Sequence, residues 1–398
     1  MRTAGRVLLL NLLFAVLLVG LVELVYSSLA WLFVTPGNIW IFEDIGRTVR
    51  FDPVRGYTLT RTPARFARII DGDIEYVGTF RGNAQGMPDR DDFTPERPPG
   101  IARRYAVFGD SYSSAQYLAI NWPDRTEDLL MAAGAPIELL NFSTHGAGLA
   151  NWVSNLEGIL AQDNYLVDGL IFAVFGDDLR RRFTLADGRD RERFSFGHVE
   201  GWNPAGYPQT RAEAGELLAS HEISTAYILS SSEFDAALTG DWEPERFWEF
   251  KVLNAAAFHG SRLWQAVHRH FAVRPGPRPA KSHFGQGQLR HIDAIRDYAA
   301  ARDLPVWVIH IPDLEQAAGK AEPGYAASRE FARRLAAVFI DGRQAFAGFP
   351  PEALPDLWFE HDKHWNQAGS NAFAGFMAEH LLRRAAAGGT QATAPSIR

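Results

Sequence analysis

The stretch Leu170-Ile171-Phe172-Ala173-Val174-Phe175 decides the fold class, because this uninterrupted apolar run ends at Gly176. A strand that is apolar on both faces is typical of the centre of a parallel sheet that helices cover on each side. Its neighbours in the sheet are therefore expected to be parallel strands as well.

Outward from this segment, predicted strands and helices alternate along the chain. Strands are predicted at 105–108, 137–140, 306–309 and 338–340, and helices from Trp122 to a stop at Gly134, around 289–301, around 326–335 and at 367–384. This alternation predicts a flavodoxin-like three-layer α/β/α sandwich with a parallel sheet. In such sheets ligands bind beyond the carboxyl ends of the strands.

Three further regions accompany the predicted core. Residues 36–104 indicate an irregular β lead-in that packs on the main domain, which spans 105–384. Within that domain, a central insertion at about 180–287 contains aromatic-rich segments, 247–258 and 263–271, that indicate helices. The Ala-, Gly- and Thr-rich tail at 385–398 is predicted to be disordered.

Composition limits the function classes. The 398 residues are 46% hydrophobic and 22% charged, which fits one large globular domain with appendages. The net charge of -7 and the lack of a long basic block give no electrostatic case for binding nucleic acid. Because the sequence has no cysteine, disulfides, cysteine nucleophiles and thiolate metal sites are excluded.

The N-terminus predicts a membrane anchor over residues 1–35. Arg2 and Arg6 precede an apolar run from Val7 to Val34, longer than the about 20 residues that span a bilayer. Glu23 costs about 2.5 to 3.5 kcal/mol at mid-membrane, which the surrounding Leu and Val residues offset. The arginines place the N-terminus in the cytoplasm and the body outside. A signal peptide cleaved after Ser28-Leu29-Ala30 stays open, and it also exports the body.

Two separate segments supply the groups of a nucleophilic site. Val107-Phe108-Gly109-Asp110-Ser111 leaves a serine hydroxyl where a strand ends, and Asp362-Lys363-His364 lies before the last helix. Residues two apart in an extended segment share a face, so Asp362 can orient His364 while the other imidazole nitrogen reaches Ser111. Such a set predicts acyl transfer, with Ser111 N–H as an oxyanion donor.

The chain resembles the SGNH, or GDSL-type, hydrolase superfamily over roughly residues 50–380, less the insertion. The block with the serine is followed by a strand and a glycine turn, in which Gly146 would be a second oxyanion donor. The last block resembles exported bacterial members tied to polysaccharide O-acetylation. The matching segments are 108–113, 141–146 and 361–369, with similar lead-in segments at 51–57 and 83–86.

One block departs from the superfamily pattern. Where the pattern has Gly-x-Asn-Asp or Gly-Asn-Asp, with the Asn side chain as an oxyanion donor, this chain has Gly176-Asp177-Asp178. An ionised Asp177 only accepts hydrogen bonds and would repel the oxyanion. Three explanations stay open: Asp177 is protonated by burial beside Asp178, another group donates, or the protein is inactive or nearly so.

The resemblance implies a serine esterase or O-acyltransferase anchored in the inner membrane and facing the periplasm. Its substrate would be an acyl ester, with acetyl the favoured acyl group, of an envelope carbohydrate, and polysaccharide machinery would be a partner. His145 and Trp365 are candidate substrate-binding residues. No cofactor or metal is expected, since His361 and His364 lack a third ligand of comparable spacing. A non-catalytic scaffold subunit is the alternative.

Overall fold

The computed structural model describes residues 2–33, 38–176, 178–190, 193–199, 210–218, 226–242, 284–320 and 323–389. Its centre is a five-stranded sheet in the order β13-β12-β8-β6-β7, with every neighbouring pair parallel. The strands are β6 (Arg103–Phe108), β7 (Ile137–Asn141), β8 (Leu170–Phe175), β12 (Val306–Ile311) and β13 (Val338–Asp341). In chain order this arrangement is 2-1-3-4-5, a doubly wound order whose ligand site lies where the winding reverses, between β6 and β8.

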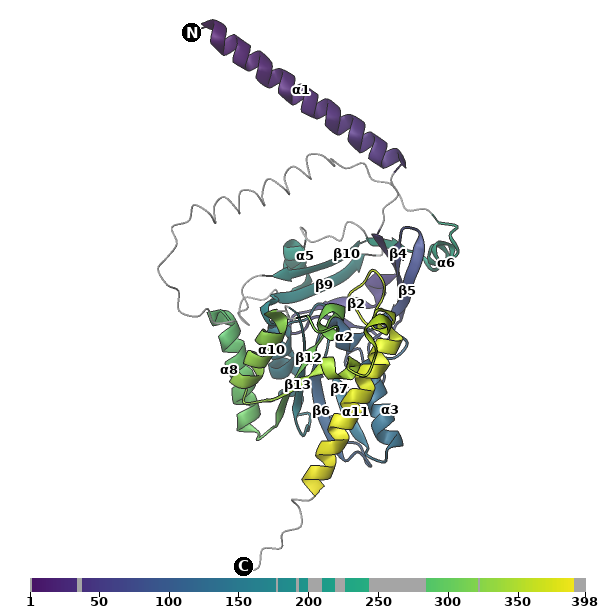
Figure 1. The fold of residues 1–398 in the computed structure, drawn as a ribbon, viewed down its shortest axis with the longest axis vertical. Helices are drawn as coiled ribbons and strands as arrows, with labels where there is room; N and C mark the ends of the chain where they lie inside the picture. Colours follow the sequence, from purple (N-terminus) through teal and green to yellow (C-terminus); the bar gives the residue numbers. More distant parts are fainter. Residues whose placement is uncertain are drawn as a thin grey trace, which may run out of the picture.

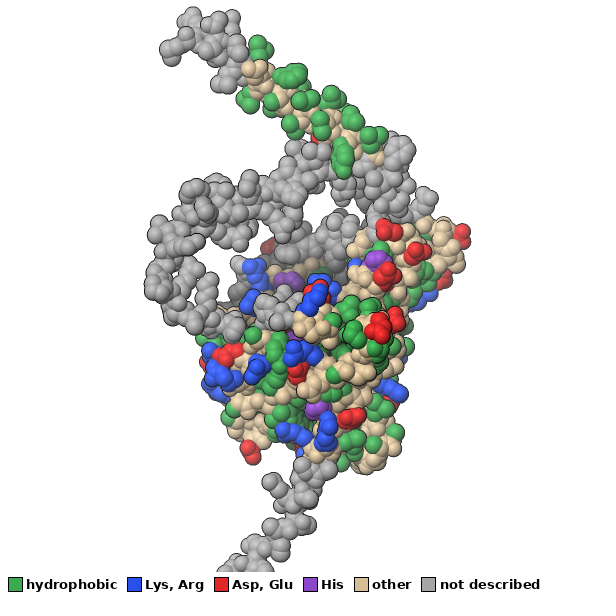
Figure 2. Space-filling model, viewed as in Figure 1, with side chains coloured by type: hydrophobic (Ala, Val, Ile, Leu, Met, Phe, Trp, Pro, Cys, Tyr) green, Lys and Arg blue, Asp and Glu red, His purple; other side chains and the backbone are tan. Residues whose placement is uncertain are grey.

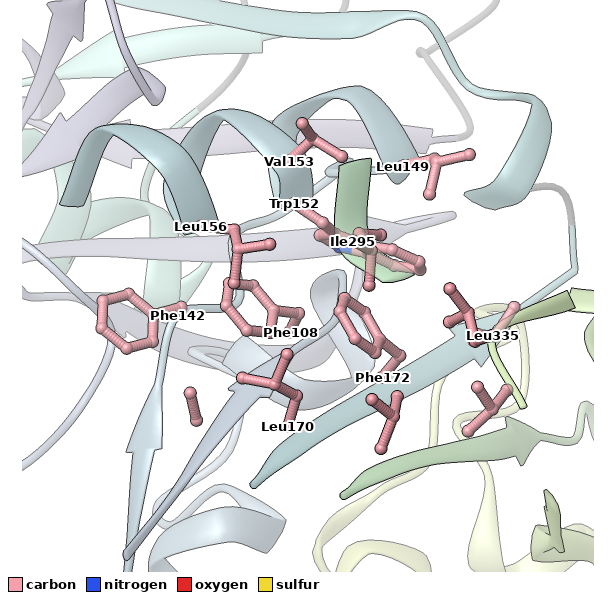
Figure 3. Close-up of a cluster of buried hydrophobic side chains, with 14 of the residues drawn as sticks. Phe108, Phe142, Leu149, Trp152, Val153, Leu156, Leu170, Phe172, Ile295 and Leu335 are labelled. Atoms are coloured by element: carbon pink, nitrogen blue, oxygen red, sulfur yellow. The ribbon is translucent and has the colours of Figure 1, made fainter. Parts of the chain in front are cut away.

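Helices cover both faces of this sheet (Figure 1). Phe108 and Phe172 face one buried cluster, in which Trp152 packs on the same face (Figure 3). Alternate residues of the same strands, among them Val107 and Ile171, face the other cluster. The first face carries α4 (Leu149–Asn155), α8 (Gln286–Ala301) and α10 (Pro323–Arg334); the second carries α3 (Trp122–Ala132) and α11 (Gln367–Gly389). The predicted parallel α/β core is confirmed.

The lead-in is β structure, as expected, but its strands over 38–80 are regular, and only 81–102 contains no helix or strand. A second sheet has the order β11-β1-β4-β5, from β1 (Asn38–Glu43), β4 (Ala64–Ile70), β5 (Asp73–Phe80) and β11 (Ala226–Leu229). A separate hairpin consists of β2 (Val49–Asp52) and β3 (Gly56–Leu59). Both faces of β1 are buried, because Ile39 and Ile41 pack in one cluster while Phe42 packs in another. The alternation of apolar and polar residues that marks a half-buried strand is therefore lost.

The described part of the insertion contains strands as well as helices, which corrects the expectation of a helical insertion. The strands β9 (Phe183–Asp190) and β10 (Arg193–Val199) form an antiparallel hairpin, and β11 adds parallel to β1 of the lead-in. The helices are α5 (Arg211–Leu218) and α6 (Ser231–Thr239). The predicted helical segments 247–258 and 263–271 lie outside the described residues. The strand β11 has its partner in a distant part of the chain, so no local pattern reveals it.

Both ends of the chain are helical where described. The helix α1 (Arg2–Phe33) contains Leu10–Leu29, a window of mean hydropathy 2.3 that is long enough to cross a membrane. Apolar side chains predominate on the coloured part of α1 in Figure 2, and Glu23 accepts a hydrogen bond from Ser27 Oγ. By length and composition, α1 fits a membrane anchor or a signal sequence. At the other end, α11 extends to Gly389, past the predicted end at 384, and 390–398 are not described.

Candidate active site

Ser111 begins a short helix, α2 (Ser111–Ser114), directly after β6. The turn before it needs glycine, because a Cβ on Gly109 would lie 2.4 Å from Ser113 Oγ. Asp110 caps the helix, accepting a hydrogen bond from Tyr112 N–H at 2.9 Å. The end of the strand and the capped turn thus fix the serine at the edge of the sheet.

The structure brings the predicted nucleophile, base and carboxylate together. Ser111 Oγ lies 2.6 Å from His364 Nε2, and His364 Nδ1 lies 2.5 Å from Asp362 Oδ1. With a proton on Nδ1 facing the carboxylate, Nε2 is left to accept the serine proton. The ring of Tyr112 packs 4.7 Å from the His364 ring, and its hydroxyl donates to Lys363 O. The arrangement therefore supports proton transfer from a serine hydroxyl to an imidazole.

The lead-in sheet holds the carboxylate, a feature that the sequence analysis missed. Arg68 Nη1 lies 2.7 Å from Asp362 Oδ2, and Tyr76 O–H donates to the same oxygen at 2.9 Å. Glu75 Oε1 accepts the backbone N–H groups of His361 and Asp362 at 2.6 and 3.0 Å. Arg68 and Tyr76 are directly opposite each other on β4 and β5. Two neighbouring strands thus fix the segment that carries His364.

This environment keeps Asp362 ionised. Burial by itself raises the pKa of its carboxyl, but the hydrogen bond from His364 and the charges of His364 and Arg68 outweigh burial. The net effect holds the pKa of Asp362 well below its usual range. The carboxylate can therefore accept the Nδ1 proton and stabilise the imidazolium that forms during proton transfer.

A second buried ion network lies beside Ser111. Arg181 Nη1 pairs with Asp110 Oδ2 at 3.1 Å and with Asp178 Oδ1 at 2.9 Å, and both carboxylates are buried. Asp178 also accepts Phe175 N–H at 2.8 Å. The charge of Asp178 is thus paired with a guanidinium. Asp177, which stands where the superfamily pattern has the Asn donor, lies outside the described residues.

The loop after β7 carries the second predicted oxyanion donor. Gly146 has a φ of +70°, and a Cβ there would lie 2.4 Å from the Phe196 ring, so both backbone conformation and space require glycine. Tyr57 O–H donates to His145 O at 3.0 Å, and Thr184 Oγ1 donates to Gly146 O at 2.6 Å. These bonds fix the loop from two other strands. The role of Gly146 as a donor stays a prediction.

The two candidate substrate-binding side chains lie in different surroundings. His145 lines a cavity next to His364, and burial, with the nearby charge of His364, lowers its pKa to about 3, so it stays neutral. Trp365 is only 1% exposed and packs in the core with Phe346 and Phe373. The structure does not place Trp365 in the lining of that cavity.

The cavity has a volume of about 180 Å³ and borders His364. Most of its lining comes from aromatic side chains of the lead-in, joined by Tyr117 and by Phe196 of β10. The aromatic residues include Trp40, Phe42, Phe66, Phe80, Tyr117 and Phe196. An apolar chamber therefore opens beside the Ser111–His364 pair, a feature that only the pairing of distant strands creates.

Within the described ranges, no group of three or more His, Cys, Asp or Glu side chains is arranged to hold a metal ion. His361, the residue considered as a metal ligand with His364, has Nδ1 3.7 Å from Glu75 Oε1. The site as described therefore contains acid–base groups on one side and an apolar cavity on the other.

The fold and site together define a mixed α/β protein with serine, imidazole and carboxylate groups in contact at the edge of a parallel sheet. No protein-family model matches the sequence, and no curated protein matches it.

Solved structures that resemble it include a lipase/acylhydrolase from Enterococcus faecalis (TM-score 0.35, 8% identity, 71% of this chain and 96% of that one). Others are a psychrotrophic esterase from Pseudoalteromonas sp. (0.34, 12%, 71% and 97%) and an acetylxylan esterase from Geobacillus stearothermophilus (0.32, 10%, 71% and 94%).

Proposed function

We propose that this protein is a membrane-anchored SGNH-type serine esterase or O-acyltransferase that acts outside the cytoplasm through Ser111, His364 and Asp362. The observation that carries the proposal is the continuous contact from Ser111 Oγ through His364 to Asp362, at 2.6 and 2.5 Å. The apolar window in α1 supports the inner-membrane anchor and the periplasmic placement of the body.

The reaction follows from the positions of these atoms. Ser111 Oγ attacks the acyl carbonyl carbon while its proton moves to His364 Nε2. The C–O bond of the ester then breaks, and the departing alcohol takes the proton from Nε2, which leaves the acyl group on Ser111. Water or a sugar hydroxyl then gives a proton to His364 Nε2 and attacks the acyl carbon. The bond between this carbon and Ser111 Oγ breaks, Oγ takes the proton back from Nε2, and the acyl group leaves on the acceptor. Ser111 N–H and Gly146 N–H are the proposed oxyanion donors.

Water as the acceptor gives an esterase, and a carbohydrate hydroxyl gives a transferase. The sequence resemblance favours an envelope carbohydrate as substrate and acetyl as the acyl group, with polysaccharide machinery as partner. The enzyme class does not depend on the length of the acyl chain. Partitioning of an acyl-enzyme between water and an added glycan, measured in a single turnover, separates the two activities.

Fluorophosphonate labelling tests the nucleophile. We expect the full-length protein to be labelled once, and labelling to be lost in Ser111→Ala. Ser114→Ala is the matched control, because Ser114 is a buried serine of the same short helix and should leave labelling intact. A folded wild type that takes no label would refute the proposal and favour the scaffold alternative.

A further inference from the structure

We propose that the aromatic cavity beside His364, called here the acyl cavity, receives the acyl chain of the substrate, and that the preferred chain is apolar and longer than the acetyl group that the sequence resemblance favours. This inference rests on the proposed function, because the cavity matters to catalysis only if Ser111 accepts an acyl group. His364, which contacts Ser111 Oγ, is itself part of the cavity wall. A carbonyl carbon held at Ser111 therefore has its chain at the entrance of the cavity.

The chemistry of the wall favours a hydrocarbon over a sugar ring. Val49 and aromatic rings form most of the surface, and two of the tyrosine hydroxyls are already occupied. Tyr57 O–H donates to His145 O, and Tyr76 O–H donates to Asp362. A sugar enclosed here would lose water from several hydroxyls and find few partners, at a cost for each unpaired group. An alkyl or aryl chain loses nothing by the same transfer.

Two buried polar atoms in the wall fit the polar end of such a substrate. Tyr117 Oη and His145 Nε2 have no hydrogen-bond partner within the described residues. The Tyr117 ring lies 4.8 Å from the His364 ring and 6.1 Å from the His145 ring. A buried polar atom without a hydrogen-bond partner destabilises the protein, so a hydrogen bond from each of these atoms to a ligand atom would stabilise the complex. An ester has one polar end and one apolar chain, which match the two polar atoms and the apolar wall of the cavity.

The volume sets the chain length. An apolar cavity of about 150 Å³ binds benzene, so the 180 Å³ of the acyl cavity suits a chain of about six carbons. Acetyl would place a single methyl group there and leave most of the apolar wall unused. Each methylene that enters the cavity should raise kcat/KM about fourfold. From acetate to hexanoate, the expected gain is on the order of 100-fold.

The test is the chain-length profile of kcat/KM on p-nitrophenyl esters from acetate to dodecanoate, measured with the full chain in detergent. We expect a maximum near hexanoate. Val49, 1% exposed, lies in the wall, so Val49→Phe should move the maximum to shorter chains and Val49→Ala to longer ones. Val77→Phe makes the same substitution at a residue of β5 that is 43% exposed, and it should leave the profile unchanged.

A measurement that needs no turnover complements the profile. In Ser111→Ala, ethyl hexanoate should change the tryptophan fluorescence through Trp40, which lines the cavity, at concentrations on the order of 100-fold lower than ethyl acetate.

The outcomes separate the two proposals. A profile that falls steadily from acetate, with turnover that depends on Ser111, overturns the chain-length inference and leaves the proposed function standing. Turnover of no ester overturns the proposed function. In that case, equal binding of ethyl hexanoate and ethyl acetate to Ser111→Ala overturns the acyl cavity as well.

Discussion

Arg68→Met removes the cation that lies between the two buried carboxylates Asp362 and Glu75. Arg68 Nη1 lies 2.7 Å from Asp362 and 3.3 Å from Glu75, and the three side chains are only 12%, 8% and 6% exposed. Removing one partner of a buried ion pair costs about 3 to 5 kcal/mol, because the remaining charge stays buried without compensation. We expect the free energy of unfolding to fall by about this amount, measured by chemical denaturation.

The same substitution should slow catalysis. Arg68 and His364 contact opposite oxygens of the Asp362 carboxylate, so Arg68 helps to fix the group that orients the imidazole. Without the guanidinium, the carboxylate can turn away from His364 Nδ1. Misplacing a catalytic group in this way can cost about 100-fold in rate, so we expect kcat to fall by about that factor.

Two further variants make this test specific. Arg65→Met changes another arginine of β4, whose pair with Glu43 at 2.7 Å lies farther out, and it should leave kcat unchanged. Arg68→Met combined with Glu75→Gln removes the carboxylate charge that Arg68→Met leaves unpaired, so it should recover part of the stability but not kcat. An unchanged kcat in folded Arg68→Met would show that the guanidinium does not position the carboxylate, and the reasoning would be wrong.

Three other substitutions examine separate parts of the structure. Asp362→Asn presents an amide donor to Nδ1 and favours the wrong imidazole tautomer, so kcat should fall about 10⁴-fold. The variant should stay folded and keep the same number of fluorophosphonate binding sites. An unchanged kcat would remove Asp362 from the mechanism. Tyr76→Phe keeps the ring in the acyl cavity and loses the bond to Asp362, so kcat should fall most for the esters that fill the cavity. An equal fall of kcat for every ester would show that the two roles of Tyr76 are not coupled. Burial raises the pKa of Asp124 to about 7. The folded state then holds more protons than the unfolded state between about pH 4 and 7, and stability falls as pH rises through this window. Asp124→Asn should therefore remove about 2 kcal/mol of the stability difference between about pH 5 and pH 8 in urea titrations, and an unchanged difference would show that Asp124 does not titrate there.

The sequence predicts the central sheet well and the lead-in poorly, for a physical reason. The strand β8 has the predicted bounds, 170–175, because burial on both faces leaves an apolar run that ends at a glycine. The place of Ser111 follows from the rule that ligands bind beyond the carboxyl ends of parallel strands, and His364 reaches the same edge from the loop before α11. Arg68 and Tyr76 carry no such signal, since their role depends on the register between β4 and β5. Arg65 and Arg68 both interrupt the apolar residues of β4, so the sequence does not distinguish the arginine that reaches Asp362.

The lead-in sheet therefore joins two tasks that are separate in the sequence. The Tyr76 ring lines the acyl cavity, while its hydroxyl binds the carboxylate that orients His364. A chain that fills the cavity presses against the same residue that fixes the base, and the partner strand supplies Arg68 to the same oxygen. Substrate length and proton transfer should consequently be coupled: a well-filled cavity limits the motion of Tyr76 and keeps the Asp362 bond intact. Longer chains should then raise kcat as well as lower KM, because binding energy far from the carbonyl acts on the orientation of the base.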